Sequence, residues 1–140
     1  VIIRNIAAGS FSERYGVDEG FVFETPTIEF SYKNDELGDP LLNEYHATAM
    51  KLATREEIDT IKRYAFGVNE QLKAFWAECG VTLVDFKLEF GRLADEISPD
   101  TCRLWDSITH EKLDKDRFRR DLGGVENAYA EVMKRLTEHM

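Results

Sequence analysis

The central part of the chain reads LVDFKLEFGRLADEISPDTCRLWD, residues 83–106. Apolar and charged residues alternate along its first half, which predicts a strand with one dry face and one charged face. The apolar positions are Val84, Phe86, Leu88 and Phe90. The charged positions are Asp85, Lys87 and Glu89. A row of carboxylate, ammonium and carboxylate is suited to binding a metal ion and an anion.

The second half of this stretch adds further acids around a single arginine. The acids are Asp95, Glu96, Asp100 and Asp106, and the arginine is Arg103. Carboxylates bind a cation and a fixed guanidinium binds a phosphate, so the combination predicts phosphoryl chemistry.

Whether Glu89 and Asp95 can share one metal ion depends on the turn between them. A three-residue turn of Gly91, Arg92 and Leu93 places Glu89 directly opposite Asp95, about 5 Å apart at Cβ, which suits a bridging Mg²⁺. A two-residue turn directs Asp95 to the buried side instead. The sequence leaves both turns open.

Composition predicts one ordinary globular domain over residues 1–140. Of these residues, 43% are hydrophobic and 32% are charged, and no apolar run approaches the ~20 residues that cross a bilayer. We therefore expect a cytoplasmic protein without a membrane segment or signal peptide. The formal charge of −9 argues against a nucleic-acid surface, and an anionic substrate requires locally placed arginine and lysine.

Several common site types are not supported by the motifs. Cys79 and Cys102 are far apart in sequence and favour reduced thiols over a disulfide or a metal site. The three histidines lack metal-ligand spacing, which argues against zinc chemistry and a Ser-His-Asp hydrolase. Neither GxxxxGK[ST] nor GxGxxG occurs, so neither of those phosphate loops is expected in this chain.

The N-terminal segment offers two interpretations of Ser10. The chain opens on an apolar run at residues 1–3, as if within a strand, which predicts a fragment lacking its N-terminal part. Ser10 followed by Glu13 is a capping box for a short helix that ends at Gly16. Alternatively, Gly9, Ser10 and the first helical N–H groups form an anion seat to which Arg4 adds charge.

Further elements follow from periodicity. A half-buried strand is predicted over residues 27–33, then a charged turn over 33–40 in which Asp39 stands between Gly38 and Pro40. A capping box at Thr54 and Glu57 begins a long amphipathic helix over a sheet. Its predicted buried stripe is Ile58, Ile61, Ala65, Val68, Leu72, Phe75, Trp76 and Cys79.

The C-terminal part predicts two more helices. The first is a charged helix over residues 114–122, whose arginines (Arg117, Arg119 and Arg120) we interpret as a salt-bridged surface. The second follows two glycines and is amphipathic. Its predicted buried face is Val125, Ala128, Tyr129, Val132, Met133 and Leu136.

With these residues in view, the chain closely resembles the SAICAR synthetase family (phosphoribosylaminoimidazole-succinocarboxamide synthase) of purine biosynthesis. The matching blocks are RNIAAGS (4–10), KNDELGDP (33–40), VDFKLEFG (84–91), LADEISPDTCRLWD (93–106) and LDKDRFRRDLGG (113–124). They occur in family order and span nearly the whole chain. The resemblance implies an α+β, ATP-grasp-like fold in which an antiparallel sheet packs against amphipathic helices.

The resemblance also implies a reaction and its residues. The family is an ATP-dependent C–N ligase that joins L-aspartate to carboxyaminoimidazole ribotide through an acyl phosphate, with Mg²⁺, and is often oligomeric. By matching position, the resemblance implies that Arg4, Ser10 and Arg103 bind the ribotide phosphate. It implies that Glu89 and Asp95 bind Mg²⁺-ATP. Asp39 and Asp85 lie near the ribotide ring and its metal, with Lys33 and Lys87 as charge stabilisers.

Two departures from the family pattern leave more than one function open for this chain. The N-terminal portion that clasps ATP in the family is absent, and the turn at residues 91–93 is shorter than usual. The leading hypothesis is the ligase. The alternatives are a non-catalytic fragment that binds the ribotide without ATP, and a small-molecule kinase of related architecture, against which the RNIAAGS block and Arg103 argue.

Overall fold

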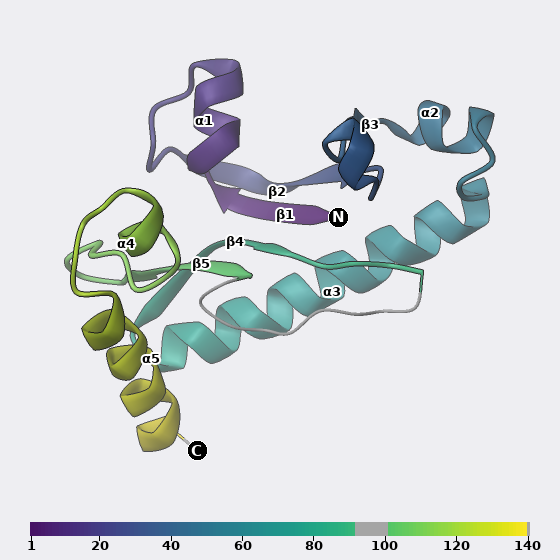
Figure 1. Cartoon of the computed structure of the whole chain (residues 1–140). Helices are drawn as coiled ribbons and strands as arrows, with labels where there is room; N and C mark the ends of the chain where they lie inside the picture. Colours follow the sequence, from purple (N-terminus) through teal and green to yellow (C-terminus); the bar gives the residue numbers. More distant parts are fainter. Residues whose placement is uncertain (92–100, 140) are drawn as a thin grey trace.

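The computed structural model describes residues 1–91 and 101–139, and their strands form one five-stranded sheet. The strand order is β3-β2-β1-β4-β5, and every neighbouring pair is antiparallel (Figure 1). The strands are β1 (Ile2–Ile6), β2 (Val22–Ser31), β3 (Leu41–Leu42), β4 (Val81–Lys87) and β5 (Cys102–Asp106). Helices cover this sheet, so the predicted α+β class is confirmed.

The long helix α3 (Arg55–Glu78) packs along one face of the sheet (Figure 1). It begins at the predicted capping box: Thr54 Oγ1 accepts from Glu57 N–H, and the Glu57 carboxylate accepts from Thr54 N–H. Trp76 lies in the core as predicted, but Phe75 is 37% exposed, so its place in the buried stripe was wrong. Neighbours at a 100° step cannot both face the sheet fully.

An unpredicted polar contact joins α3 to the sheet. Asn5 Nδ2 donates to Asn69 Oδ1 at 2.8 Å and to the Leu83 carbonyl at 3.2 Å. Asn69 Nδ2 donates back to Asn5 Oδ1 at 3.0 Å. Because the two buried amides satisfy each other, they can lie inside an apolar layer and hold α3 at one position along β1.

Strand β4 departs from the predicted alternation. Val84 packs with Ala8 and Trp105, whereas Phe86 and Leu88 belong to the main core against α3. A β-bulge between residues 83 and 85 causes this difference, because one extra residue reverses the face of those that follow. The predicted dry face is therefore divided between two apolar clusters.

The N-terminal elements extend further than the sequence predicts. β1 includes Arg4, which pairs with Thr27 on one side and Asp85 on the other, so polar neighbours allow a charged residue to stay in the strand. β2 begins at Val22 rather than at residue 27. Between them lies α1 (Gly9–Tyr15), and after β2 come the 3-10 turn η1 (Asp35–Leu37) and α2 (Glu44–Ala49).

The C-terminal elements are α4 (Asp116–Arg119) and α5 (Val125–His139). α4 is shorter than the predicted helix over 114–122, because Asp121 has φ 52°, which an α-helix cannot contain. α5 is confirmed, with Ala128 and Val132 buried, although Met133 is 63% exposed and does not belong to the buried face. Both lie at the end of the sheet that also carries α1 (Figure 1).

None of the helices in residues 1–91 and 101–139 has the length and apolar character needed to span a bilayer. Cys79 and Cys102 are both buried thiols rather than a disulfide, as predicted.

Candidate functional site

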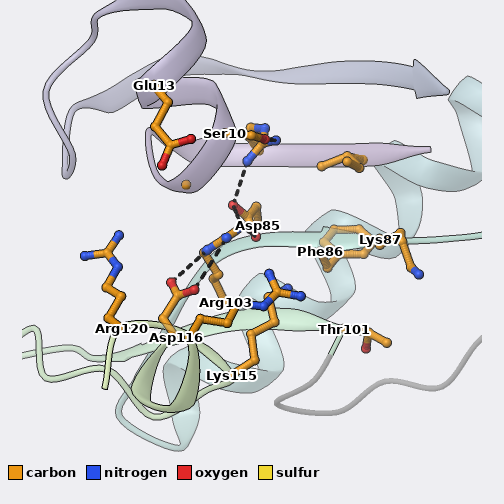
Figure 2. Close-up of a pocket in the computed structure, with 14 residues that line it drawn as sticks. Ser10, Glu13, Asp85, Phe86, Lys87, Thr101, Arg103, Lys115, Asp116 and Arg120 are labelled. Atoms are coloured by element: carbon orange, nitrogen blue, oxygen red, sulfur yellow. Dashed lines mark hydrogen bonds and ion pairs between the residues drawn. The ribbon is translucent and has the colours of Figure 1, made fainter. Parts of the chain in front are cut away.

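A cavity of about 480 Å³ lies at the end of the sheet, between α1 and α4 (Figure 2). Its lining comes from β1, α1, β4, β5 and α4, which are far apart in sequence. The cationic lining residues are Arg4, Lys87, Arg103, Lys115, Arg119 and Arg120, and the anionic ones are Glu13, Asp85 and Asp116. This concave surface is therefore locally basic on a chain of net charge −9, as an anionic ligand requires.

Asp85 lies at the centre of a buried row of alternating charges. Its Oδ2 accepts hydrogen bonds from Arg4 Nη1 and from Arg103 Nη1, each at 3.1 Å. Arg103 Nε donates in turn to Asp116 Oδ2 at 2.9 Å. Figure 2 shows Arg103 between Asp116 and Asp85, linked to both by dashed lines. Burial raises the pKa of Asp85, while Arg103 and Arg4 oppose that rise. The guanidinium groups therefore hold fixed positions.

The β-bulge in β4 is what places Asp85 in the cavity. Leu83 pairs with Leu104 in the main core, whereas Asp85 pairs with Arg103. In a regular strand Leu83 and Asp85 would share one face, because side chains alternate with a period of two. The extra residue turns Asp85 away from the core and toward Arg103.

Arg4 is 1% exposed and is surrounded by protein acceptors. Besides Asp85, its Nη1 group donates to the Ala8 carbonyl at 3.3 Å and its Nη2 group to Ser10 Oγ at 3.0 Å. Its Nε group pairs with Glu29. Arg4 is thus placed to orient Asp85 and Ser10, and its predicted contact with a phosphate stays a prediction.

The start of α1 does not have the predicted cap. The N-cap position is Ala8 and no side chain caps the helix, so Ser10 lies inside the first turn and the capping interpretation was wrong. Gly9 has φ 53°, and a Cβ there would lie 2.8 Å from Arg103 Cζ. Glycine is therefore needed for Arg103 to approach α1, on both conformational and steric grounds.

Lys115 and Arg119 are site residues that the sequence interpretation missed. Both line the cavity, and neither makes an ion pair with any residue in the described part of the chain. Burial lowers the pKa of Lys115, and the neighbouring Arg103 adds to that effect. Their spacing of four residues at the start of the charged segment is the signal that could have placed them on one side.

The neighbouring arginines behave differently. Arg117 pairs with Glu111 at 3.3 Å, and Arg120 pairs with Glu19 at 2.9 Å. The salt bridges predicted for this segment are therefore confirmed for Arg117 and Arg120. Arg120 also lines the cavity, and Arg119 lines it without an ion pair among the described residues.

A second group of predicted residues lies around Glu89, just past the C-terminal end of β4. Glu89 Oε1 pairs with Lys33 Nζ at 3.2 Å and with Lys87 Nζ at 3.4 Å. These lysines lower the pKa of Glu89, Lys33 more strongly. Asp39 has φ 49°, and its Oδ1 accepts from Asn34 N–H at 2.8 Å, so it stabilises the turn after β2 and does not line the cavity.

Of the two predicted metal ligands, the structure describes only Glu89. Asp95 lies outside the described residues, so its sharing of a metal ion with Glu89 stays a prediction. A three-residue turn followed by a regular ladder would pair Phe86 with Ser98. In the structure Phe86 pairs with Cys102 instead, so the observed pairing of β4 and β5 differs from that simple hairpin. Residues 1–91 and 101–139 contain no group of three potential metal ligands. The Glu89 carboxylate is nevertheless a hard oxygen donor of the kind that Mg²⁺ prefers.

Comparisons with known proteins agree with this architecture. The sequence model of the family described as SAICAR synthetase matches residues 1–136. A phosphoribosylaminoimidazole-succinocarboxamide synthase from Lachnoclostridium phytofermentans is 62% identical over 142 residues, which cover 97% of this chain and 60% of the relative. The chain thus spans about 60% of the length of this curated relative.

Two solved structures are similar over nearly the whole chain. The phosphoribosylaminoimidazole-succinocarboxamide synthase of Ehrlichia chaffeensis has a TM-score of 0.94 at 47% identity, covering 97% of this chain and 62% of its own. A SAICAR synthetase (Type-2) in complex with ADP has a TM-score of 0.93 at 48% identity, covering 98% and 61%.

Proposed function

Because the chain belongs to the SAICAR synthetase family, we propose that it forms part of an ATP-dependent ligase that joins L-aspartate to carboxyaminoimidazole ribotide in purine biosynthesis. The observation that supports this most directly is the basic cavity around Arg103, Lys115 and Arg119. A ribotide carries a phosphate and a carboxylate, and fixed guanidinium groups bind both by paired hydrogen bonds.

Different residues of the cavity are proposed to bind different parts of the ribotide. Arg103, Ser10 and Arg4 form the predicted phosphate site, and we add to it Lys115 and Arg119, which make no ion pair within residues 1–91 and 101–139. Asp85, which is held by Arg4 and Arg103, is positioned for the imidazole ring side of the substrate. Orientation by a rigid cradle reduces the entropy cost of bringing two reactants together.

The reaction proceeds in two steps. An oxygen of the ribotide carboxylate attacks the γ-phosphorus of ATP, ADP leaves, and an acyl phosphate forms. The aspartate amine then attacks the acyl carbon, inorganic phosphate leaves with the C–O electron pair, and the nitrogen loses a proton to give the amide. Lys33 and Lys87 are proposed to neutralise charge on the transferring phosphoryl group, with Asp39 near the substrate ring.

The ATP side of the site is proposed to lie around Glu89. A homologous SAICAR synthetase is solved in complex with ADP, which supports nucleotide binding in this family. Glu89, with Asp95, would hold Mg²⁺, and the metal would neutralise phosphate charge there. We further propose that the enzyme acts in the cytoplasm as a homo-oligomer.

A turnover assay tests the ligase. The full-length enzyme should release ADP only when the ribotide and L-aspartate are both present. Glu89→Gln should lose Mg²⁺-dependent turnover, because the amide is a poor Mg²⁺ ligand. Normal turnover in Glu89→Gln would overturn the metal assignment, and phosphate transfer to a hydroxyl acceptor would favour a kinase.

One observation favours a narrower second function, a ribotide-binding unit without catalysis. The cavity brings together Arg4, Ser10 and Arg103, the residues predicted for the ribotide phosphate, whereas the chain spans 60% of the length of the L. phytofermentans relative. Calorimetry on the chain separates the two functions. Binding of the ribotide together with ATP supports the ligase, and ribotide binding without ATP binding supports the narrower unit.

A further inference from the structure

Asp114 is a fully buried carboxylate that neither lines the cavity nor contacts solvent, with 0% exposure. Its Oδ2 accepts a hydrogen bond from the backbone N–H of Leu104 at 2.7 Å. Its Oδ1 accepts from the backbone N–H of Asp116 at 2.8 Å. One side chain therefore connects the backbone of β5 to the first residue of α4.

These two hydrogen bonds complete a ring that includes the cavity wall. Leu104 directly follows Arg103, and Arg103 Nε donates to Asp116 Oδ2 at 2.9 Å. The ring therefore runs from Asp114 through Leu104 and Arg103 to Asp116, and returns to Asp114. Lys115 lies between the two aspartates, so the same ring determines where its ammonium group enters the cavity.

A carboxylate at this position is energetically unfavourable by itself. Burial raises the pKa of Asp114 to about 6, and the neighbouring Asp116 adds to the rise while Arg103 opposes it. The two backbone donors, however, require two acceptor oxygens. Asparagine has a single acceptor and would turn an N–H group toward one of the donors. A costly charge in this position is typical of a residue kept for site geometry.

Asp106, at the opposite end of β5, provides a natural comparison. Its Oδ1 accepts from the backbone N–H groups of Ile108 at 2.9 Å and Thr109 at 2.8 Å. Its Oδ2 accepts from Arg135 Nη2 at 2.6 Å. Asp106 thus also accepts from two backbone N–H groups, but neither it nor these partners line the cavity.

We propose that Asp114 is a positioning residue, whose carboxylate holds β5 and α4 in the one arrangement that presents Arg103 and Lys115 to an anionic ligand. The contact ring itself is independent of any ligand. The consequence for ribotide affinity rests on the proposed function.

The ligand-independent test is the Arg103 Nε–H signal in an NMR spectrum of the full chain. In Asp114→Asn, this proton should lose its protection against solvent exchange by about tenfold or more, because the hydrogen bond to Asp116 loses its anchor. In Asp106→Asn it should be unchanged. Equal protection of Arg103 in all three proteins would overturn the proposal.

The second readout is binding of carboxyaminoimidazole ribotide by calorimetry. Asp114→Asn should weaken the affinity about tenfold, as supporting residues around a binding site commonly do, and Asp106→Asn should leave it unchanged. An equal loss in both variants would assign Asp114 a merely structural role. If the unaltered chain does not bind the ribotide, the proposed function fails, and the Arg103 signal still decides the proposal.

If Asp114→Asn does not fold, the unaltered chain supplies the test. Protonation of Asp114 puts an O–H group against a backbone donor, so the Arg103 Nε–H signal should change in step with the Asp114 carboxyl resonance. The charged groups around Asp114 are Asp116, Arg103 and Lys115. An Arg103 signal that does not follow the Asp114 titration overturns the proposal.

Discussion

Asp85 in strand β4 and Glu89, just past the end of that strand, carry the same charge in opposite surroundings. Asp85 pairs with Arg4 and Arg103, and its side chain is 3% exposed. Glu89 pairs with Lys33 and Lys87, and its side chain is 35% exposed. The first group is held by packing and many hydrogen bonds, whereas the second keeps contact with water.

This difference has a physical consequence for function. Removing one partner of a buried ion pair strongly destabilises the folded protein, because the other charge stays buried. An exposed ion pair contributes only about 0–1 kcal/mol to the free energy of unfolding. The group around Asp85 therefore acts as a rigid cradle, and the group around Glu89 can rearrange at little cost. A rigid cradle suits the substrate that must be oriented, and adaptable charges suit a metal and a transferring phosphoryl group.

The largest expected effect is that of Asp85→Asn. Removing this charge leaves Arg4 with Glu29 and Arg103 with Asp116 as their remaining anions, so the free energy of unfolding should fall by about 3 kcal/mol, the lower end for a broken buried ion pair. Denaturant titration followed by circular dichroism measures it. A loss below about 1 kcal/mol would show that the groups around Asp85 and Glu89 do not differ as described.

The next effect is a pH dependence that comes from Asp114. Its pKa in the folded protein is about 6, above the ordinary 3.8, so the folded state binds the extra proton between these values. This group's favourable contribution is fully present below pH 3.8 and is lost as pH rises toward 6, by on the order of 1.4 kcal/mol per pKa unit.

Comparison with Asp114→Asn isolates that contribution. The difference in unfolding free energy between the unaltered chain and the variant should change with pH only in this window, because Asp116, Arg103 and Lys115 remain in both. Urea titrations at several pH values measure it. A difference that is constant across the window would contradict the raised pKa.

A smaller effect is expected from Gly9→Ala, with Gly16→Ala as its matched control. Both glycines have positive φ, 53° and 65°, so both substitutions cost about 1 kcal/mol in backbone strain. Only at Gly9 does the new Cβ meet Arg103, and nothing lies within 4 Å at Gly16. Thermal unfolding should show an excess loss of about 1 kcal/mol for Gly9→Ala; equal losses would argue against the close approach of Arg103.

The smallest stability effect is expected from Glu89→Gln. Its ion pairs are exposed, so the free energy of unfolding should change by about 0.5 kcal/mol or less. Denaturant titration under the conditions used for Asp85→Asn measures the contrast directly. A loss as large as that of Asp85→Asn would remove the distinction between the rigid group around Asp85 and the adaptable group around Glu89.

Much of the fold could be predicted from local patterns. The capping box at Thr54 begins α3, and the apolar period of α5 and the alternation in β4 identify a helix and a strand. The misses arise where tertiary contacts override a local signal. Ser10 has the right spacing for a cap, but its hydroxyl accepts a hydrogen bond from Arg4 and the helix begins two residues earlier than predicted.

The candidate site was predicted in part. Arg4, Ser10, Asp85 and Arg103 do come together, since each belongs to a block with a family resemblance. Asp39 instead stabilises its own turn. Lys115 and Arg119 were hidden in a charged segment, because a sequence cannot show which cations of such a segment already have acidic partners.

The sequence by itself determined the family, the α+β class and the residue types of a phosphate and metal chemistry, because these depend on local patterns and on matching blocks. Only the tertiary structure decided which charges meet. The bulge in β4 directs Asp85 toward Arg103, and Asp114 joins Leu104 to Asp116. The first depends on the register between β4 and β5, where a shift of one residue would reverse the face of each side chain.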